Sequence, residues 1–243
     1  MESMIRVRDV KAARGVLWMS GGWHLFRRHP ALWAGFALGW LAITFGLLLV
    51  PLIGGVVANF LQPIFFASFA VAARKQLAGE RVEMGDLFSG FRRNARALAN
   101  IGALLLIAGM GIVLLMGALG LPMMTGPGGS LPNFSEYFQQ LETQDWLVLL
   151  LGLVLLAALK GALWFAPALL AFHDLSTAHA IRWSVYAALS NIGALLVYGA
   201  VLMVAFFAAI IPWGLGLAVA IPVMLASTYI GYADVFEETP IEG

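Results

Sequence analysis

Long apolar runs alternate with short polar stretches along the whole chain. The runs cover about residues 31–50, 52–73, 97–120, 146–172, 192–211 and 215–232. Each is close to the roughly 20 residues that an α-helix needs to cross the hydrocarbon core of a bilayer, which is about 30 Å thick. The pattern predicts an all-α integral membrane protein with six transmembrane helices.

Turn residues separate these runs on one side of the predicted membrane. Pro51 is followed by two glycines, and Pro212-Trp213-Gly214 divides the last two runs. Between them lies one longer loop, residues 121–145, which contains no Lys or Arg. Within it, Asn133-Phe134-Ser135-Glu136 resembles a capping box, which predicts a short surface helix.

Basic residues gather on the other side. Every Lys and Arg except Lys160 lies within residues 1–30, within residues 74–96, or at Arg182. Cytoplasmic loops of membrane proteins carry this excess of positive charge. We therefore expect both termini in the cytoplasm and the loop 121–145 outside.

Composition supports the membrane class and excludes several kinds of site. The 243 residues are 61% hydrophobic and 11% charged, whereas soluble domains average roughly 45–50% and about 25%. There is no cysteine, which excludes disulfides, thiolate metal sites and cysteine nucleophiles. The net charge of +1 selects no class of partner.

Amphipathic segments precede three of the runs. Arg14 is interleaved with Trp18 and Trp23 before the first, Asp86–Phe91 leads into the third, and a segment beginning near Ala178 leads into the fifth. Such segments lie in the membrane interface. The predicted architecture is three repeated hairpins, each preceded by a cytoplasmic interfacial amphipathic helix.

A nine-residue sequence supports that repeat. Residues 97–105 read ALANIGALL and residues 188–196 read ALSNIGALL, so eight of nine positions are identical. We expect a single polytopic membrane domain over residues 1–243, with repeat units at about 10–73, 83–172 and 176–234. Repeats that run in the same direction argue against an inverted transporter pair.

Lys160 is the most anomalous residue, because a cation inside an apolar span costs about 3 kcal/mol on insertion scales. Three explanations stay open. It faces a polar pocket, it reaches the interface with help from Pro167, or it pairs with another subunit or a lipid phosphate. An internal acidic partner would have to come from the ends of spans, such as Asp174 or Asp234.

Asn59 and Gln62 lie in the second run and could line a polar cavity with Lys160. The alternative is that both only hydrogen-bond neighbouring helices, as amides in membranes commonly do. The same explanation applies to Asn100 and Asn191, near the inner ends of their runs.

Two further surface hypotheses concern lipid and helix packing. Six basic residues are candidate contacts for anionic lipid, or they serve topology alone: Arg14, Arg27, Arg28, Arg92, Arg93 and Arg96. Ala31, Gly35 and Gly39 form a small-residue stripe, which predicts close helix packing inside the chain or between two copies.

No catalytic constellation is present in the sequence. It contains no HExxH, GxSxG, P-loop or GxGxxG motif, and an enzyme needs some such arrangement of groups. The four histidines have spacings that match no helical ligand pair. We expect no enzyme activity, no catalytic residues, no metal and no cofactor.

Several segments are similar to those of a known family. They include Phe26-Arg27-Arg28, Phe91-Arg92-Arg93 and Trp164-Phe165-Ala166-Pro167-Ala168-Leu169, with a closing segment at residues 229–236. The chain resembles a family of six-span proteobacterial inner-membrane proteins that has no assigned activity. The resemblance implies the inner membrane of a Gram-negative bacterium and implies no reaction.

The leading functional hypothesis is a non-enzymatic accessory, scaffold or assembly subunit of an inner-membrane complex. The alternative is a small transporter or lipid-handling protein with a polar cavity around Lys160. Expected partners are membrane lipids, anionic on the cytoplasmic side, and other membrane protein subunits. No nucleic acid is expected.

Overall fold

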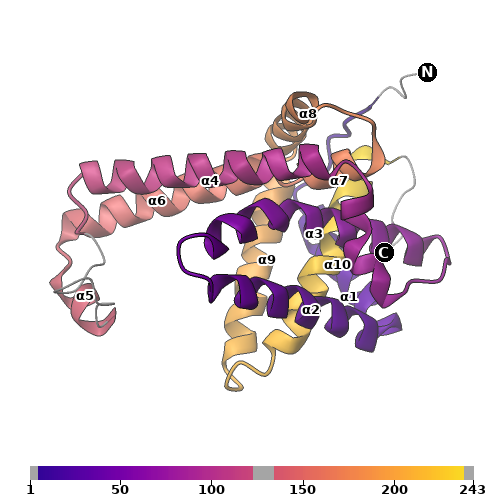
Figure 1. Ribbon diagram of the computed structural model, residues 1–243, viewed down its shortest axis with the longest axis horizontal. Helices are drawn as coiled ribbons and strands as arrows, with labels where there is room; N and C mark the ends of the chain where they lie inside the picture. The colour runs from indigo at the N-terminus through magenta and orange to yellow at the C-terminus, as the bar shows by residue number, and fades with distance from the viewer. Residues whose placement is uncertain (1–4, 123–133, 238–243) are drawn as a thin grey trace. The chain divides into compact units, whose positions relative to one another are not determined.

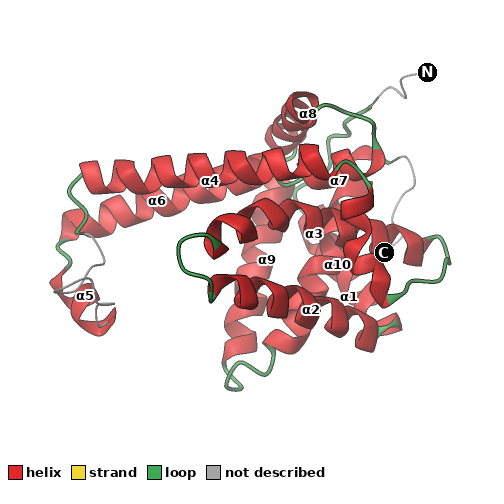
Figure 2. Cartoon of the chain, viewed as in Figure 1, coloured by secondary structure: helices red, strands yellow, loops and turns green. Residues whose placement is uncertain are grey.

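The computed structural model describes residues 5–122 and 134–237 and contains only helices and loops within them (Figure 2). Six segments are long and apolar enough to cross a membrane: Pro30–Leu48, Gly54–Leu77, Ala95–Ala118, Thr143–Phe172, Ile192–Ile210 and Leu217–Phe236. The prediction of an all-α multi-pass membrane protein is confirmed.

Figure 1 labels the helices along the chain. Their bounds are α1 Arg14–Arg28, α2 Pro30–Leu48, α3 Gly54–Leu77, η1 Met84–Arg92 (a 3₁₀-helix), α4 Ala95–Ala118, α5 Phe134–Gln140, α6 Thr143–Ala162, α7 Ala166–Phe172, α8 Thr177–Ser190, α9 Ile192–Ile210 and α10 Leu217–Phe236.

Contacts divide the chain into two compact units. The first comprises Met1–Ala103 and Ala162–Gly243, and the second comprises Leu104–Gly161. The division passes through α4 and α6, and therefore through the second predicted repeat unit, 83–172. The single membrane domain with three repeat units stays a prediction.

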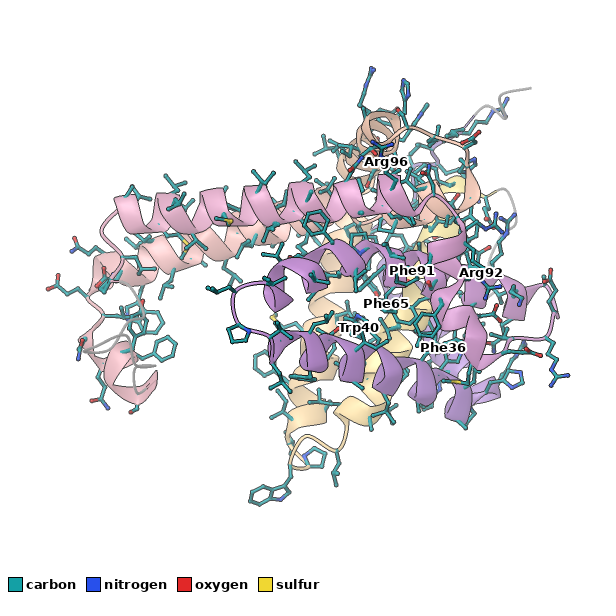
Figure 3. The ribbon with its side chains drawn as sticks, viewed as in Figure 1. Phe36, Trp40, Phe65, Phe91, Arg92 and Arg96 are labelled. Atoms are coloured by element: carbon teal, nitrogen blue, oxygen red, sulfur yellow. The ribbon has the colours of Figure 1, made fainter. Side chains whose placement is uncertain are left out.

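Two spans, α3 and α10, form the centre of the first unit. In their most apolar stretches, 56% of the α3 residues and 67% of the α10 residues are buried. α10 packs against α1, α2, α3 and α9. Aromatic side chains fill the space between α2, α3 and η1: Phe36, Trp40 and Phe65 point toward this region in Figure 3, and the Phe65 and Phe91 rings lie 5.6 Å apart.

Helix α1 packs inside the protein more deeply than expected, because the sequence predicted an amphipathic helix in the membrane interface. Trp18 and Leu25 are almost completely buried, and α1 lies against α9 and α10. Gly15 and Gly22 allow this approach, because a Cβ at Gly22 would lie 2.7 Å from the Val223 carbonyl oxygen. Two turns of helix place both glycines on one face, which brings the α1 backbone close to its neighbours.

The connection between α3 and α4 packs on the α2 small-residue stripe. The Lys75 ammonium lies 2.9 Å from the Asp86 carboxylate, which ties the end of α3 to η1. A Cβ at Gly35 would lie 3.0 Å from the Met84 side chain, and one at Gly39 would lie 2.9 Å from Leu87. The stripe is therefore used for packing inside the chain.

The second unit contains parts of α4 and α6, which run side by side (Figure 1). Gly152 of α6 faces the Met116 side chain of α4. Many other side chains of both helices are exposed, including Leu114, which is 71% exposed. The predicted short helix is present as α5, whereas Asn133 of its proposed capping box lies outside the described residues.

The predicted fourth helix is interrupted within its span. α6 ends at Ala162 and α7 begins at Ala166. The Ser184 hydroxyl donates to the Ala162 carbonyl at 2.7 Å and accepts from the Phe165 amide at 3.1 Å. Side-chain hydroxyls can satisfy backbone groups that a helix break frees in a membrane, and Ser184 has this role here.

Candidate functional site

The residues of the predicted polar cavity lie on two helices. Asn59 and Gln62 are half-buried on α3 in the first unit, and Lys160 is on α6 in the second. The Asn59 side-chain amide donates to the Gly55 carbonyl at 2.9 Å, one turn earlier in the same helix. Asn59 therefore has a hydrogen-bond partner within α3, and a cavity shared by all three residues stays a prediction.

The position of Lys160 becomes clearer once the helix break is known. It lies in the last turn of α6, two residues before the helix ends. The unpaired carbonyl groups of a helix C-terminus carry partial negative charge and attract cations. The sequence alone placed Lys160 in the interior of a span, whereas the structure places it at a helix end.

The six candidate lipid contacts fall into two groups. Arg27, Arg28, Arg92, Arg93 and Arg96 are exposed. Arg14 differs, because its guanidinium forms an ion pair with Asp234 and its side chain is 27% exposed. Contact of the exposed group with anionic lipid stays a prediction, while Arg14 has a structural partner inside the protein.

The pairing of Arg14 with Asp234 forms a buried polar group in the first unit. Asp234 lies on α10 with no exposed side-chain surface. It accepts two hydrogen bonds from the Arg14 guanidinium, with the Nε atom at 2.8 Å, and a third from the Trp18 indole at 2.8 Å. A buried carboxylate needs such partners, because an uncompensated charge there is strongly destabilising.

This cluster of Arg14, Trp18 and Asp234, the α1–α10 clasp, joins segments from opposite ends of the sequence. The hydrogen bond to Asp234 raises the pKa of Arg14 above its ordinary value, although burial opposes the shift. Arg14 therefore stays charged. The clasp fixes the start of α1 on the end of α10.

A second polar group surrounds a cavity of about 330 Å³ near the end of α10. The His173 Nε2 atom and the Tyr232 hydroxyl share a hydrogen bond of 2.9 Å. The Tyr229 hydroxyl donates to Glu237 at 2.8 Å. The Arg74 guanidinium lies 4.0 Å from Glu237. The cavity thus presents one cation, one anion and an imidazole.

His173 supplies the imidazole of this cavity, and the ordinary pKa of an imidazole lies close to neutral pH. Burial lowers the pKa of His173, the nearby Arg74 guanidinium lowers it further, and Glu237 opposes the shift. With a pKa below the ordinary 6.5, the imidazole is neutral at pH 7. It can exchange a proton or hydrogen-bond a small polar molecule.

Sequence reasoning missed both groups. It named Asp234 only as a possible partner of Lys160, and it assigned Arg14 to lipid or to topology alone. The available signal was that Asp234 directly follows an apolar run, so the fold buries it and it needs a cation. Identifying Arg14 as that cation required the packing of α1.

The comparisons with known proteins give the family. The chain is 31% identical over 233 residues to the probable inner membrane protein BTH_II0599 of Burkholderia thailandensis, covering 91% of this chain and 82% of that protein. The chain belongs to this family of inner-membrane proteins. No family model and no solved structure matches.

Membership explains the apolar surface. Together with the six apolar helices, the relative supports a multi-pass protein of the inner membrane. Its name assigns no reaction, substrate or partner.

Proposed function

We propose that the protein is a non-enzymatic accessory or assembly subunit of an inner-membrane complex. We further propose that the α4–α6 hairpin is the surface that contacts another membrane protein. The distribution of basic residues supports a cytoplasmic position for both termini, with anionic lipid around the basic inner loops as the expected surroundings.

The observation that supports this proposal is the low burial of two long spans. In the most apolar stretches of Ala95–Ala118 and Thr143–Phe172, only 11% of the residues are buried inside the chain. Lipid can also cover such faces, so a protein contact surface needs a second indication besides exposure.

The glycines on the hairpin add a second indication. Apart from the nearby backbone and the chain neighbours in the same helix, no described atom lies within 4 Å of the position that a Cβ would take at Gly109, Gly111 or Gly117 of α4, or at Gly161 of α6. Small residues on membrane helices let a second helix approach closely. Glycine also lowers helix stability by roughly 1 kcal/mol relative to alanine in water, so four open glycines favour a packing role.

The test is native purification of the full chain in mild detergent, followed by mass spectrometry of the proteins that remain bound. We expect a stoichiometric membrane protein with the unaltered chain, and its loss with Gly109→Leu combined with Gly117→Leu.

A matched control is available in the first unit. Gly46 on α2 and Gly199 on α9 also have no described atom within 4 Å of a Cβ. Gly46→Leu combined with Gly199→Leu should retain the partner. Equal retention by both double variants would contradict the hairpin as the contact surface, and a chain that purifies alone would contradict the subunit role.

A transporter or lipid-handling protein is the second candidate, favoured by the cation of Lys160 within an apolar span. In that case Lys160→Met should abolish the function of the protein in a cellular assay and leave any complex intact. A silent Lys160→Met would remove the main support for this candidate.

A further inference from the structure

A cavity of about 700 Å³ lies between the N-terminal segment and α8, apart from the groups described above. The polar and aromatic residues that line it are Arg6, His179, Arg182, Trp183 and Tyr186. Its described lining thus carries two guanidinium groups and an imidazole, and no carboxylate. Such a lining favours the binding of an anion.

The N-terminal wall of this cavity is held in place by hydrogen bonds. The Arg8 amide donates to the Val235 carbonyl at 2.9 Å. The Val10 amide donates to the Asn191 side-chain oxygen at 2.8 Å, and the Asn191 side-chain amide donates to the Arg8 carbonyl at 2.9 Å. The segment that carries Arg6 is therefore fixed on α10 and on the α8–α9 junction.

On the α8 wall, the imidazole of His179 is oriented by Ser176. The Ser176 hydroxyl accepts from the His179 amide at 3.3 Å and lies 2.9 Å from the ring Nδ1 atom. When this hydroxyl donates to Nδ1, a neutral ring carries its hydrogen on Nε2. His179 then has one ring donor left for a ligand.

The cavity lies at one end of a membrane span. α8 is followed directly by α9, with only Asn191 between them, and Figure 1 shows α8 close to the N-terminal segment. Tyr186 and Leu189 of α8 are 58% and 68% exposed. Aromatic side chains in such positions lie at the level of lipid headgroups.

We propose that this cavity binds the phosphate group of an anionic phospholipid. Arg6 and Arg182 contact the phosphate oxygens, since guanidinium groups match their geometry with paired hydrogen bonds. His179 donates from Nε2, while Trp183 and Tyr186 pack against the glycerol and the first acyl carbons. The site differs from the six basic residues singled out in the sequence, and it does not depend on the subunit role.

The test uses the full chain in nanodiscs of equal phosphatidylglycerol and phosphatidylcholine, with native mass spectrometry of the lipid that stays bound after release. We expect selective retention of phosphatidylglycerol. Arg182→Gln should lower that retention about tenfold, which corresponds to about 1.4 kcal/mol, because it removes the paired hydrogen bonds of a charged donor. Arg182→Lys keeps the charge and loses the paired geometry. Its phosphatidylglycerol retention should lie between those of the unaltered chain and Arg182→Gln.

The control is Arg81→Gln, because Arg81 is 88% exposed and pairs only with Glu83 among the described ion pairs. Equal phosphatidylglycerol retention by Arg182→Gln and Arg81→Gln overturns the site. Inorganic phosphate, added as a competitor, should displace the lipid only in large excess. Displacement at concentrations near that of the lipid would assign the cavity to free phosphate and overturn the lipid assignment.

Discussion

Helices α3 and α10 are buried inside the protein, whereas α4 and α6 are among the most exposed, although all four lie in apolar spans. The buried pair carries four of the seven buried polar residues in the described part of the chain. α10 contains Ser227 and Asp234, and α3 contains Ser68 and Gln76, all of them buried. Lipid is as apolar as leucine, so hydrophobicity does not decide which helix lies inside. Polar groups that need partners, and small residues that allow close contact, decide it.

Removing the cation of the α1–α10 clasp should have the largest effect. Arg14→Met leaves Asp234 buried and without its charge partner, which we expect to lower the free energy of unfolding by about 3–5 kcal/mol. Thermal unfolding in mild detergent measures this. Arg14→Met combined with Asp234→Leu should recover much of the loss, and a failure to recover would mean that Arg14 acts through packing alone.

A matched pair of glycine substitutions tests the difference between buried and exposed helices directly. Gly22→Leu forces a side chain against Val223 and Ser227, and overpacking of this kind costs about 1–3 kcal/mol. Gly117→Leu meets no described atom within 4 Å and should change stability by less than about 0.5 kcal/mol. Equal losses of thermal stability would mean that the hairpin is packed as tightly as α1.

The smallest predicted effect is a pH dependence from His173. Because the folded pKa of His173 is lowered by burial and by Arg74, the unfolded chain takes up the proton first as the pH falls. Stability is therefore full above the unfolded pKa of about 6.5, and it decreases as the pH falls from there through the folded pKa. His173→Asn should flatten this slope in unfolding curves between pH 7.5 and pH 5. An unchanged slope would assign the pH dependence to other groups.

The sequence determined the class, the six spans and most turns of this protein. Run length and composition suffice for these, because a bilayer requires about 20 apolar residues per helix whatever their neighbours. The sequence also predicted close packing at Gly35 and Gly39, since close packing of helices needs small residues. The sequence did not predict the depth of α1, the helix break after Ala162 or the partner of Asp234. The first depends on contact with Val223, the second on Ser184 and the third on Arg14. Each of these residues is distant in the chain from the feature that it determines.

The repeated sequence shows most clearly which features follow from local sequence and which follow from the tertiary structure. ALANIGALL lies within the continuous helix α4, whereas ALSNIGALL is broken at Asn191 between α8 and α9. Local propensity is nearly the same in both, so it determined only that each segment favours a helix. The tertiary structure decided where one of them breaks, because the Asn191 side chain binds the backbone of Arg8 and Val10. The Asn100 side-chain amide, by contrast, lies 3.5 Å from the Thr177 hydroxyl.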